Sequence, residues 1–168
     1  MKCIYSYVTQ IGKISIIDDN DTITNLFFEN DTIPDNIIIK ESQLIQEAHR
    51  QLTLYLSGDL KHFSLALKPK GTDFMMKVWK ELLNIPYGTT KSYKDIAIAI
   101  GDDKASRAVG MANNRNPLPI FIPCHRVIGS NGKLVGYGSG LDIKVKLLKI
   151  EGENNTSKYN NAGNGGIL

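Results

Sequence analysis

Short apolar runs separated by polar turns open the chain. Residues 3–28 hold three such runs, CIYSYV, KISIID and TITNLFF, with IGK and DDND between them. Runs of this kind, bounded by turn-forming residues, predict a small antiparallel meander of β-strands. A loop is expected over 30–36. Apolar positions between residues 44 and 56 then predict a helix over 41–57, which Gly58 ends.

The second half of the chain follows a helical period. In TDFMMKVWKELLNIP, apolar residues at 74, 75, 78, 79, 82 and 83 lie on one face of a helix, and Trp79 is predicted to be in the core. Pro86 and Gly88 end this helix. Near the other end, LDIKVKLLKIEG predicts a final helix with apolar residues on one side and lysines on the other.

Two shorter helices are expected between these. Ser92 and Asp95 have the spacing of a capping box, so a helix begins just after Ser92 and ends at Gly101. Asp102 or Asp103 is expected to cap the next helix, KASRAVGMANNRN. Two short helices joined by a three-residue turn that contains glycine predict a helix-turn-helix.

The segment that follows the helix-turn-helix is rich in proline and glycine. NPLPIFIPC is expected to be extended because of its prolines. GSNGKLVGYGSG predicts a sharply bent loop, and the polar, Gly/Asn-rich residues 153–168 predict a disordered tail.

The composition is that of an ordinary globular protein. Of 168 residues, 42% are apolar and 22% are charged, enough for one domain or two small ones. No apolar run approaches the roughly 20 residues that span a bilayer. The N-terminal MKCIYSYVTQIGK lacks the features of a signal peptide, so a cytoplasmic location is expected.

Cysteine usage argues against both a disulfide framework and a metal site. The chain has two cysteines, Cys3 and Cys124, and three histidines, and it has no CxxC pair. Free thiols in a reducing compartment and no bound metal are therefore predicted.

Charge is divided unevenly along the chain. KPKG at 68–71 is the candidate boundary between a first domain, 1–70, and a second, 71–152. Residues 1–70 carry a net charge of −2 and residues 71–151 a net charge of +5. The second domain therefore suits a polyanionic partner, although a solvated surface with chance asymmetry explains the charge equally well.

The stretch IPCHRVI, residues 122–128, places a cysteine beside a histidine within an apolar run. By itself the pair is weak evidence, since a buried cysteine is more often a small hydrophobe than a nucleophile. In an extended strand, neighbours also point to opposite faces. The position of this pair, after a helix-turn-helix and before a glycine-rich loop, is much rarer.

The second half resembles the O6-alkylguanine-DNA alkyltransferases, which repair alkylated guanine. WKELLNIPYGTTKSYKDIA, SRAVG, NPLPIFIPCHRVI, GYGSGL and KLLKIEG follow the family's order and spacing over about residues 72–152. Residues 1–71 match only in general pattern. The resemblance implies an α+β fold, with a small N-terminal RNase H-like antiparallel sheet and a helix. A helical, winged-helix-like DNA-binding domain would follow.

The resemblance also implies roles for individual residues. Cys124 would be the alkyl acceptor, His125 the base that draws its proton through a water, and Glu151 the carboxylate that orients His125. Such a relay favours the thiolate, which is the nucleophile. Asn116 would brace the turn around the cysteine, and Tyr137 would donate a hydrogen bond to the guanine oxygen as it leaves.

A second set of residues would contact DNA. Tyr93 would help to turn the target nucleotide out of the stack, and Arg107 would fill the space it leaves, from a helix in the minor groove. The full set is Tyr93, Arg107, Ser92, Ala108, Gly110, Met111, Asn114, Val127, Gly138 and Ser139. Arg126 is read as structural support. Gly138 departs from many relatives, which have serine there, and this puts the substrate preference in doubt.

The resemblance implies irreversible, single-turnover transfer of a methyl or small alkyl group from O6 of guanine, and possibly O4 of thymine, to Cys124. No cofactor is needed, and a monomer that associates with the nucleoid when bound to DNA is expected. A lesion-binding module without transfer and a Cys-His-Glu thiol hydrolase are the alternatives. A zinc deaminase is disfavoured because its second cysteine and its H-x-E motif are absent.

Overall fold

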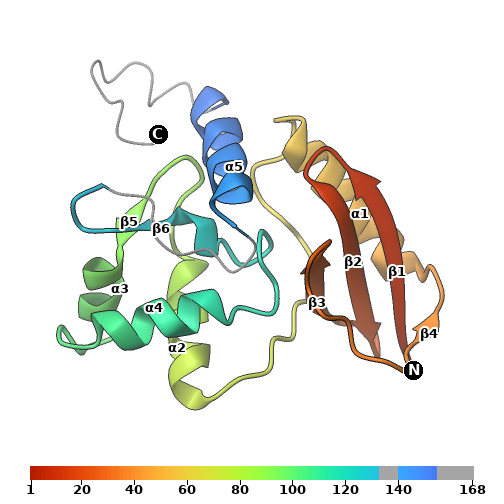
Figure 1. The fold of residues 1–168 in the computed structure, drawn as a ribbon, viewed down its shortest axis with the longest axis horizontal. Helices are drawn as coiled ribbons and strands as arrows, with labels where there is room; N and C mark the ends of the chain where they lie inside the picture. Colours follow the sequence, from red (N-terminus) through yellow and green to blue (C-terminus); the bar gives the residue numbers. More distant parts are fainter. Residues whose placement is uncertain (133–139, 155–168) are drawn as a thin grey trace. The chain divides into compact units, whose positions relative to one another are not determined.

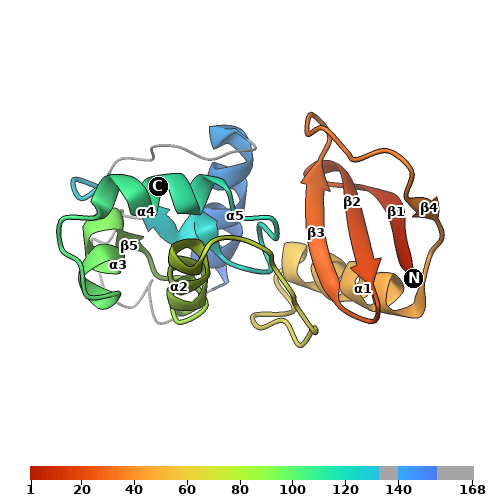
Figure 2. The same cartoon turned by 90° about the horizontal axis from the view of Figure 1, so that it is seen from below.

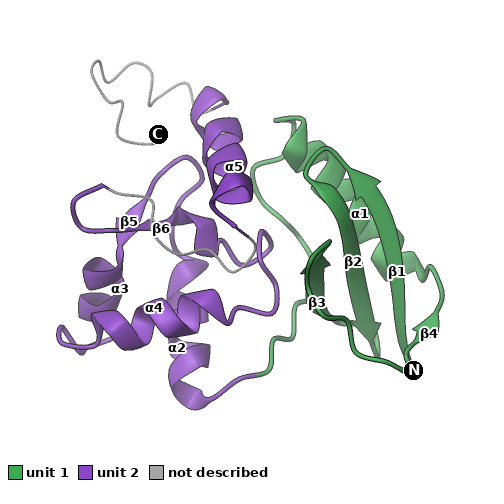
Figure 3. Ribbon diagram, viewed as in Figure 1, with its two compact units in different colours: residues 1–70 green, residues 71–168 purple. Residues whose placement is uncertain are grey.

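The computed structural model describes residues 1–132 and 140–154. The chain divides into two compact units, Met1–Lys70 and Gly71–Leu168 (Figure 3). In the described ranges no helix is long and apolar enough to cross a membrane.

The first unit is built on a four-stranded sheet in the order β3-β2-β1-β4 (Figure 1). Its strands are β1 (Lys2–Thr9), β2 (Gly12–Asp19), β3 (Ile23–Phe28) and β4 (Ile38–Ile39). The predicted meander is confirmed, because β1, β2 and β3 pair antiparallel. The sheet as a whole is mixed, because β4 crosses to the far edge and pairs parallel with β1. A two-residue strand is too short to show a period in the sequence.

Helix α1 (Gln43–Leu56) packs on one face of this sheet, as Figures 1 and 2 show. Ser42 caps it by accepting a hydrogen bond from the Ile45 amide, and Gly58 follows its end with a φ of 85°. Such a φ favours glycine, which has no Cβ to clash. The predicted helix over 41–57 is confirmed within two residues at each end. Ile45 and Leu52 are fully buried against the sheet.

The second unit is mainly helical, with one short parallel strand pair, β5–β6. Its elements are α2 (Asp73–Leu82), β5 (Lys91–Ser92), α3 (Tyr93–Ala99), α4 (Ser106–Asn114), a 3₁₀ turn (Cys124–Arg126), β6 (Val127–Ile128) and α5 (Leu141–Glu153). Helices α2, α3 and α4 contact one another (Figure 1). Trp79 of α2 is buried among them as predicted, and its indole N–H donates to the Ala112 carbonyl of α4 at 2.8 Å.

Helices α3 and α4 form the helix-turn-helix. The capping box of α3 is confirmed, because Ser92 Oγ accepts from the Asp95 amide while the Asp95 carboxylate accepts from the Ser92 amide. The predicted aspartate cap of α4 is wrong. Asp102 accepts a hydrogen bond from the Lys104 amide instead, α4 begins only at Ser106, and the connection spans 100–105 rather than three residues. A local side-chain turn competed with helix capping.

Candidate active site around Cys124

Cys124 lies in a tight 3₁₀ turn, not in the extended strand expected from its prolines. The Cys124 amide donates to the Ile122 carbonyl at 2.7 Å and the Arg126 amide donates to the Pro123 carbonyl at 3.1 Å. A 3₁₀ turn has three residues per turn, so neighbouring side chains do not point to opposite faces as they do in a strand. The Cys124 side chain is buried, with 3% of its surface exposed.

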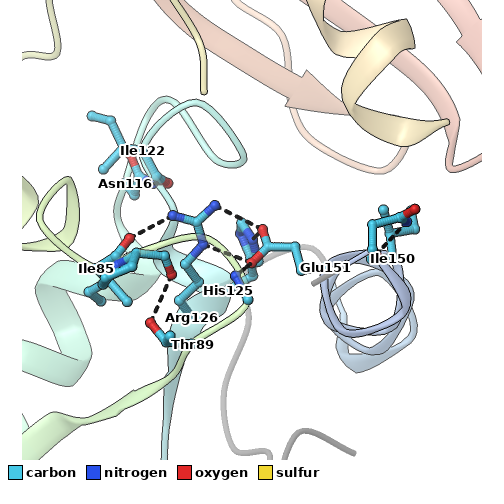
Figure 4. Close-up of polar contacts among 11 residues, drawn as sticks. Ile85, Thr89, Asn116, Ile122, His125, Arg126, Ile150 and Glu151 are labelled. Atoms are coloured by element: carbon cyan, nitrogen blue, oxygen red, sulfur yellow. Dashed lines mark hydrogen bonds and ion pairs between the residues drawn. The ribbon is translucent and has the colours of Figure 1, made fainter. Parts of the chain in front are cut away.

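His125 and Glu151 form a buried pair. Their Nε2 and Oε2 atoms lie 2.7 Å apart, and neither side chain has exposed surface (Figure 4). Glu151 comes from α5, so the last helix of the described chain supplies half of this pair. A carboxylate can only accept, so Nε2 of His125 carries the proton and Nδ1 carries the lone pair.

Arg126 holds the other edge of the same carboxylate. Its Nε donates to Glu151 Oε1 at 2.9 Å, and its Nη2 donates to Oε2 at 3.0 Å (Figure 4). A third donor, Nη1, bonds the Ile85 carbonyl at 2.7 Å, and the guanidinium lies 5.7 Å from the centre of the Tyr87 ring. The Gly88 amide gives Glu151 a fourth hydrogen bond, at 3.0 Å. The structural role expected for Arg126 thus takes the form of a bidentate ion pair.

The electrostatics of this cluster favour a charged carboxylate and a neutral imidazole. Burial by itself would raise the pKa of Glu151, but His125 and Arg126 outweigh it and hold that pKa well below its usual range. Burial lowers the pKa of His125, although Glu151 opposes this shift. Because burial holds the pKa of His125 below its ordinary value of 6.5, the imidazole is neutral near pH 7 and can take a proton at Nδ1.

Lys144 is the largest departure from the sequence-based expectation for α5. The helix was expected to turn its lysines to solvent, but the Lys144 side chain is fully buried. Its ammonium donates to the Val127 carbonyl, three residues after Cys124, at 2.7 Å. Burial lowers the pKa of Lys144 to about 8, and the charge of Cys124 acts in the opposite direction. A positive charge is therefore enclosed near the thiol.

Two asparagines join the acceptor turn, as we call the 3₁₀ turn Cys124–Arg126 after the expected role of Cys124, to α4 and to the residues that follow this helix. Asn116 Nδ2 donates to the Ile122 carbonyl at 2.9 Å, and its Oδ1 accepts from the Leu118 amide at 2.9 Å. Asn113, in the last turn of α4, donates from Nδ2 to the Cys124 carbonyl at 3.3 Å. Sequence reasoning had named the first of these asparagines and missed the second.

Six of the ten expected DNA-contacting residues lie on α3 and α4. Arg107, Ala108, Met111 and Asn114 are exposed on α4, whereas Val127 is fully buried in β6. Tyr93 begins α3, and a Cβ at Gly110 would lie 3.9 Å from the Tyr93 ring, so the two helices meet closely there. Burial raises the pKa of Tyr93, and the charge of Cys124 adds to this rise.

Three expected site residues, Tyr137, Gly138 and Ser139, lie outside the described residues. Within the described ranges, no group of three or more histidine, cysteine, aspartate or glutamate residues could hold a metal ion.

Lys144, Asn113 and the Gly88 amide are site components that sequence reasoning missed. Lys144 had a signal, since it stands seven residues before Glu151 and shares its helix face.

Comparison with known proteins agrees with this arrangement. Residues 4–69 match a family model described as the ribonuclease-like domain of 6-O-methylguanine DNA methyltransferase, and residues 73–153 match its DNA binding domain. The two matched domains, with a buried His-Glu pair next to Cys124, thus define a DNA methyltransferase that joins a ribonuclease-like domain to a DNA-binding one. More specifically, the chain belongs to the 6-O-methylguanine DNA methyltransferase family.

Individual relatives match most of the chain. A methylated-DNA–protein-cysteine methyltransferase of Methanosarcina barkeri is 62% identical over 117 residues, which are 70% of this chain and 73% of that protein. The constitutive Bacillus subtilis enzyme is 50% identical over 150 residues, 85% of this chain and 91% of its own length. The structure of Mycobacterium tuberculosis OGT in complex with DNA has a TM-score of 0.86 at 41% identity, covering 90% of this chain and 94% of that one.

Proposed function

We propose that this protein repairs DNA by direct reversal, moving a methyl or small alkyl group from O6 of guanine to Cys124. The observation that carries the proposal is the buried cluster in which Cys124 adjoins His125, and His125 is paired with Glu151 at 2.7 Å. Family membership supports the same reaction. The protein is its own acceptor, so no cofactor takes part.

The step is a displacement at carbon. The sulfur of Cys124 forms a bond to the alkyl carbon as the bond between that carbon and O6 breaks. The electron pair of the broken bond leaves with the guanine, which then takes a proton. His125 Nδ1 receives the thiol proton through a water, and Glu151 and Arg126 hold the ring in the required tautomer. Asn116 braces the turn, and Tyr137 donates to the leaving oxygen.

Enclosed positive charge near the thiol supports the nucleophile. Lys144 is fully buried and hydrogen-bonded to the Val127 carbonyl of the strand that follows the acceptor turn. A cation in a region of low dielectric favours the thiolate over the thiol more strongly than it would in water. The thioether product has no acidic proton and no charge, so the transfer does not reverse and each molecule acts once.

DNA would be engaged by the exposed face of α4 and the start of α3. The target base is stacked inside the duplex and must be extruded to reach a buried sulfur. Arg107 would fill the vacated position through the minor groove, and Tyr93 would guide the nucleotide outward. Ser92, Ala108, Gly110, Met111 and Asn114 belong to this surface, and Gly138 and Ser139 would contact the extruded base. Val127 is fully buried in β6, so it has no surface to offer the base.

The proposal extends to the range of substrates, the oligomeric state and the location of the protein. O4-alkylthymine is a second substrate to be tested, and the protein would act as a monomer. Its substrate places it with cellular DNA, hence in the nucleoid region of the cytoplasm. Whether larger alkyl groups enter depends on the segment around Gly138.

Intact mass spectrometry tests the function directly. The purified protein is incubated with duplex DNA carrying one O6-methylguanine, and the peptide that contains Cys124 is mapped. A stoichiometric gain of one CH₂ at Cys124, without turnover, is expected. Cys124→Ala should abolish the gain and keep DNA binding. Cys3→Ala is the matched control, since Cys3 is buried in β1 of the other unit, and it should leave the gain unchanged.

The other outcomes separate the alternatives. Tight binding to the lesion with no gain in mass would favour a lesion-binding module. Neither gain nor DNA binding would contradict both readings and favour a thiol hydrolase, whose acyl intermediate would be captured with activated esters.

A further inference from the structure

Helix α4 has two faces with different partners. Its exposed side carries Arg107 and Met111, the surface proposed to meet DNA. Its buried side carries Asn113, which has 2% of its surface exposed and donates from Nδ2 to the carbonyl of Cys124 at 3.3 Å. The same helix therefore faces the proposed DNA surface and contacts the residue that bears the acceptor sulfur.

Stability alone does not explain an amide at position 113. Its neighbours on the buried face, Val109 and Ala112, are apolar. The Oδ1 atom of Asn113 is buried with no hydrogen-bond partner among the described residues. Such an acceptor costs free energy, and an apolar side chain of similar size would avoid that cost. What the amide contributes is the donor that reaches the acceptor turn.

The Cys124 carbonyl is already satisfied from within its own turn. The Val127 amide donates to it, so Asn113 is a second donor to the same oxygen. The added bond is not needed to pair the carbonyl. It does fix the position of the turn relative to α4, because it joins a helix to a backbone atom of the acceptor residue.

We propose that Asn113 is a positioning residue that holds Cys124 at the correct distance from the nucleotide that α4 presents. The inference rests on the proposed function, because it concerns the distance between the sulfur and an extruded base on DNA. Attack at carbon requires the two reacting atoms to be aligned at about 3–3.5 Å, and a displacement of 1 Å costs on the order of 100-fold in rate. Loss of the hydrogen bond from Asn113 to the Cys124 carbonyl should therefore slow alkyl transfer from DNA without weakening DNA binding.

The test separates transfer, binding and thiol reactivity. Asn113→Leu and Asn113→Ala both remove the donor, and Val109→Ala is the matched control one turn earlier on the same buried face. Three quantities are measured: the single-turnover rate constant at saturating protein with a duplex carrying one O6-methylguanine, the Kd for that duplex with Cys124→Ala in each background, and the rate at which iodoacetamide labels Cys124.

We expect the saturating rate constant of both Asn113 variants to fall about tenfold or more. The Kd and the iodoacetamide rate should stay within about threefold of those of the unchanged protein. Val109→Ala should lower Tm by loss of packing but keep the rate constant of transfer. All rates are compared at a temperature at which thermal unfolding shows each variant folded, and Asn113→Ala decides if Asn113→Leu does not fold.

Three results would overturn the proposal. An equal fall in transfer and in iodoacetamide labelling would mean that Asn113 acts on the reactivity of the thiol. A rise in Kd that accounts for the slower transfer would make it a binding residue. Unchanged transfer would leave it a packing residue. Absence of transfer by the unchanged protein is a separate outcome, since it refutes the proposed function itself.

Discussion

Replacing Glu151 with glutamine should destabilise the protein and disable its relay together. The carboxylate of Glu151 accepts four hydrogen bonds, from the Gly88 amide, from His125 and twice from Arg126. Glutamine has the same shape but carries no charge, and one of its two terminal atoms donates. Half of the four donors would then face an N–H group.

The expected loss of stability in Glu151→Gln follows from the charge of Arg126, which stays buried. Arg126 is 8% exposed, and without Glu151 its guanidinium has lost its counter-charge. Breaking a buried ion pair by removing one partner costs about 3–5 kcal/mol, because the other charge stays desolvated. The four hydrogen bonds are part of that figure and are not added to it, since they share one carboxylate. A domain is stable by about 5–15 kcal/mol, so the loss is a large fraction of the total.

Urea unfolding at pH 7 would measure this loss, with the rate of alkyl transfer measured on the same samples. Glu153→Gln is the matched control, because Glu153 is an exposed carboxylate of the same helix. Its free energy of unfolding should change by no more than about 0.5 kcal/mol. The double variant Glu151→Gln/Arg126→Met should recover part of the lost stability but none of the activity. A change below about 1 kcal/mol in Glu151→Gln would refute the ion-pair reasoning.

The same pair predicts how the protein responds to acid. The pKa of Glu151 is held below its ordinary value of 4.5 in the folded state, so folding is favoured by the ionised carboxylate above that pH. This stability is lost as the pH falls below 4.5 towards the folded-state pKa. Glu151→Gln should therefore lose less stability than the unchanged protein over that acidic range, and parallel curves would contradict the linkage.

Three further predictions concern Lys144, the N-terminal cap of α3 and the close approach of Gly71 to Trp79. Because the pKa of Lys144 is lowered to about 8 by burial, the unfolded chain binds more protons above that pH, and stability should rise between pH 8 and pH 10 by about 2–3 kcal/mol relative to Lys144→Met, measured by urea unfolding. Equal pH dependence in both proteins would contradict this. Ser92→Ala removes the cap of α3 and should cost about 1 kcal/mol in thermal unfolding, with Ser92→Thr as the conservative control. Gly71→Ala would bring a methyl group to within 2.7 Å of Cζ3 of Trp79, so a loss of about 1–3 kcal/mol and a changed tryptophan fluorescence are expected, whereas unaltered fluorescence would show that the ring moves aside freely.

Local sequence patterns correctly predicted those features of the fold that depend on interactions between neighbouring residues. The Ser92–Asp95 capping box and Gly58 were read correctly because each acts through its own neighbouring backbone. The cap of α4 was misplaced because Asp102 had a competing turn within two residues. Strand β4 was missed for a different reason, since its pairing with β1 depends on where the chain returns to the sheet.

The residues of the candidate site also divide into those that the sequence predicted and those whose positions depend on tertiary packing. Residue types and their order pointed to Cys124, His125 and Glu151, and the structure brings His125 and Glu151 together. The turn geometry at Cys124 could not be predicted from local patterns. The burial of Lys144 was missed although its spacing from Leu147, Leu148 and Glu151 places it on the inward face of α5. Asn113 gave no signal, since its partner is a backbone carbonyl.

The origin of Glu151 in α5 has a consequence for how the protein is made. Glu151 stands 26 residues after His125, so a ribosome releases the thiol and the DNA-facing helices before the group that completes the relay. Until α5 packs, Cys124 is an ordinary thiol with only a few per cent thiolate at pH 7. Under the proposed mechanism, activation of the nucleophile is thus tied to completed folding. Nascent chains, and fragments cut before residue 151, would then carry no activated sulfur to be consumed by stray electrophiles.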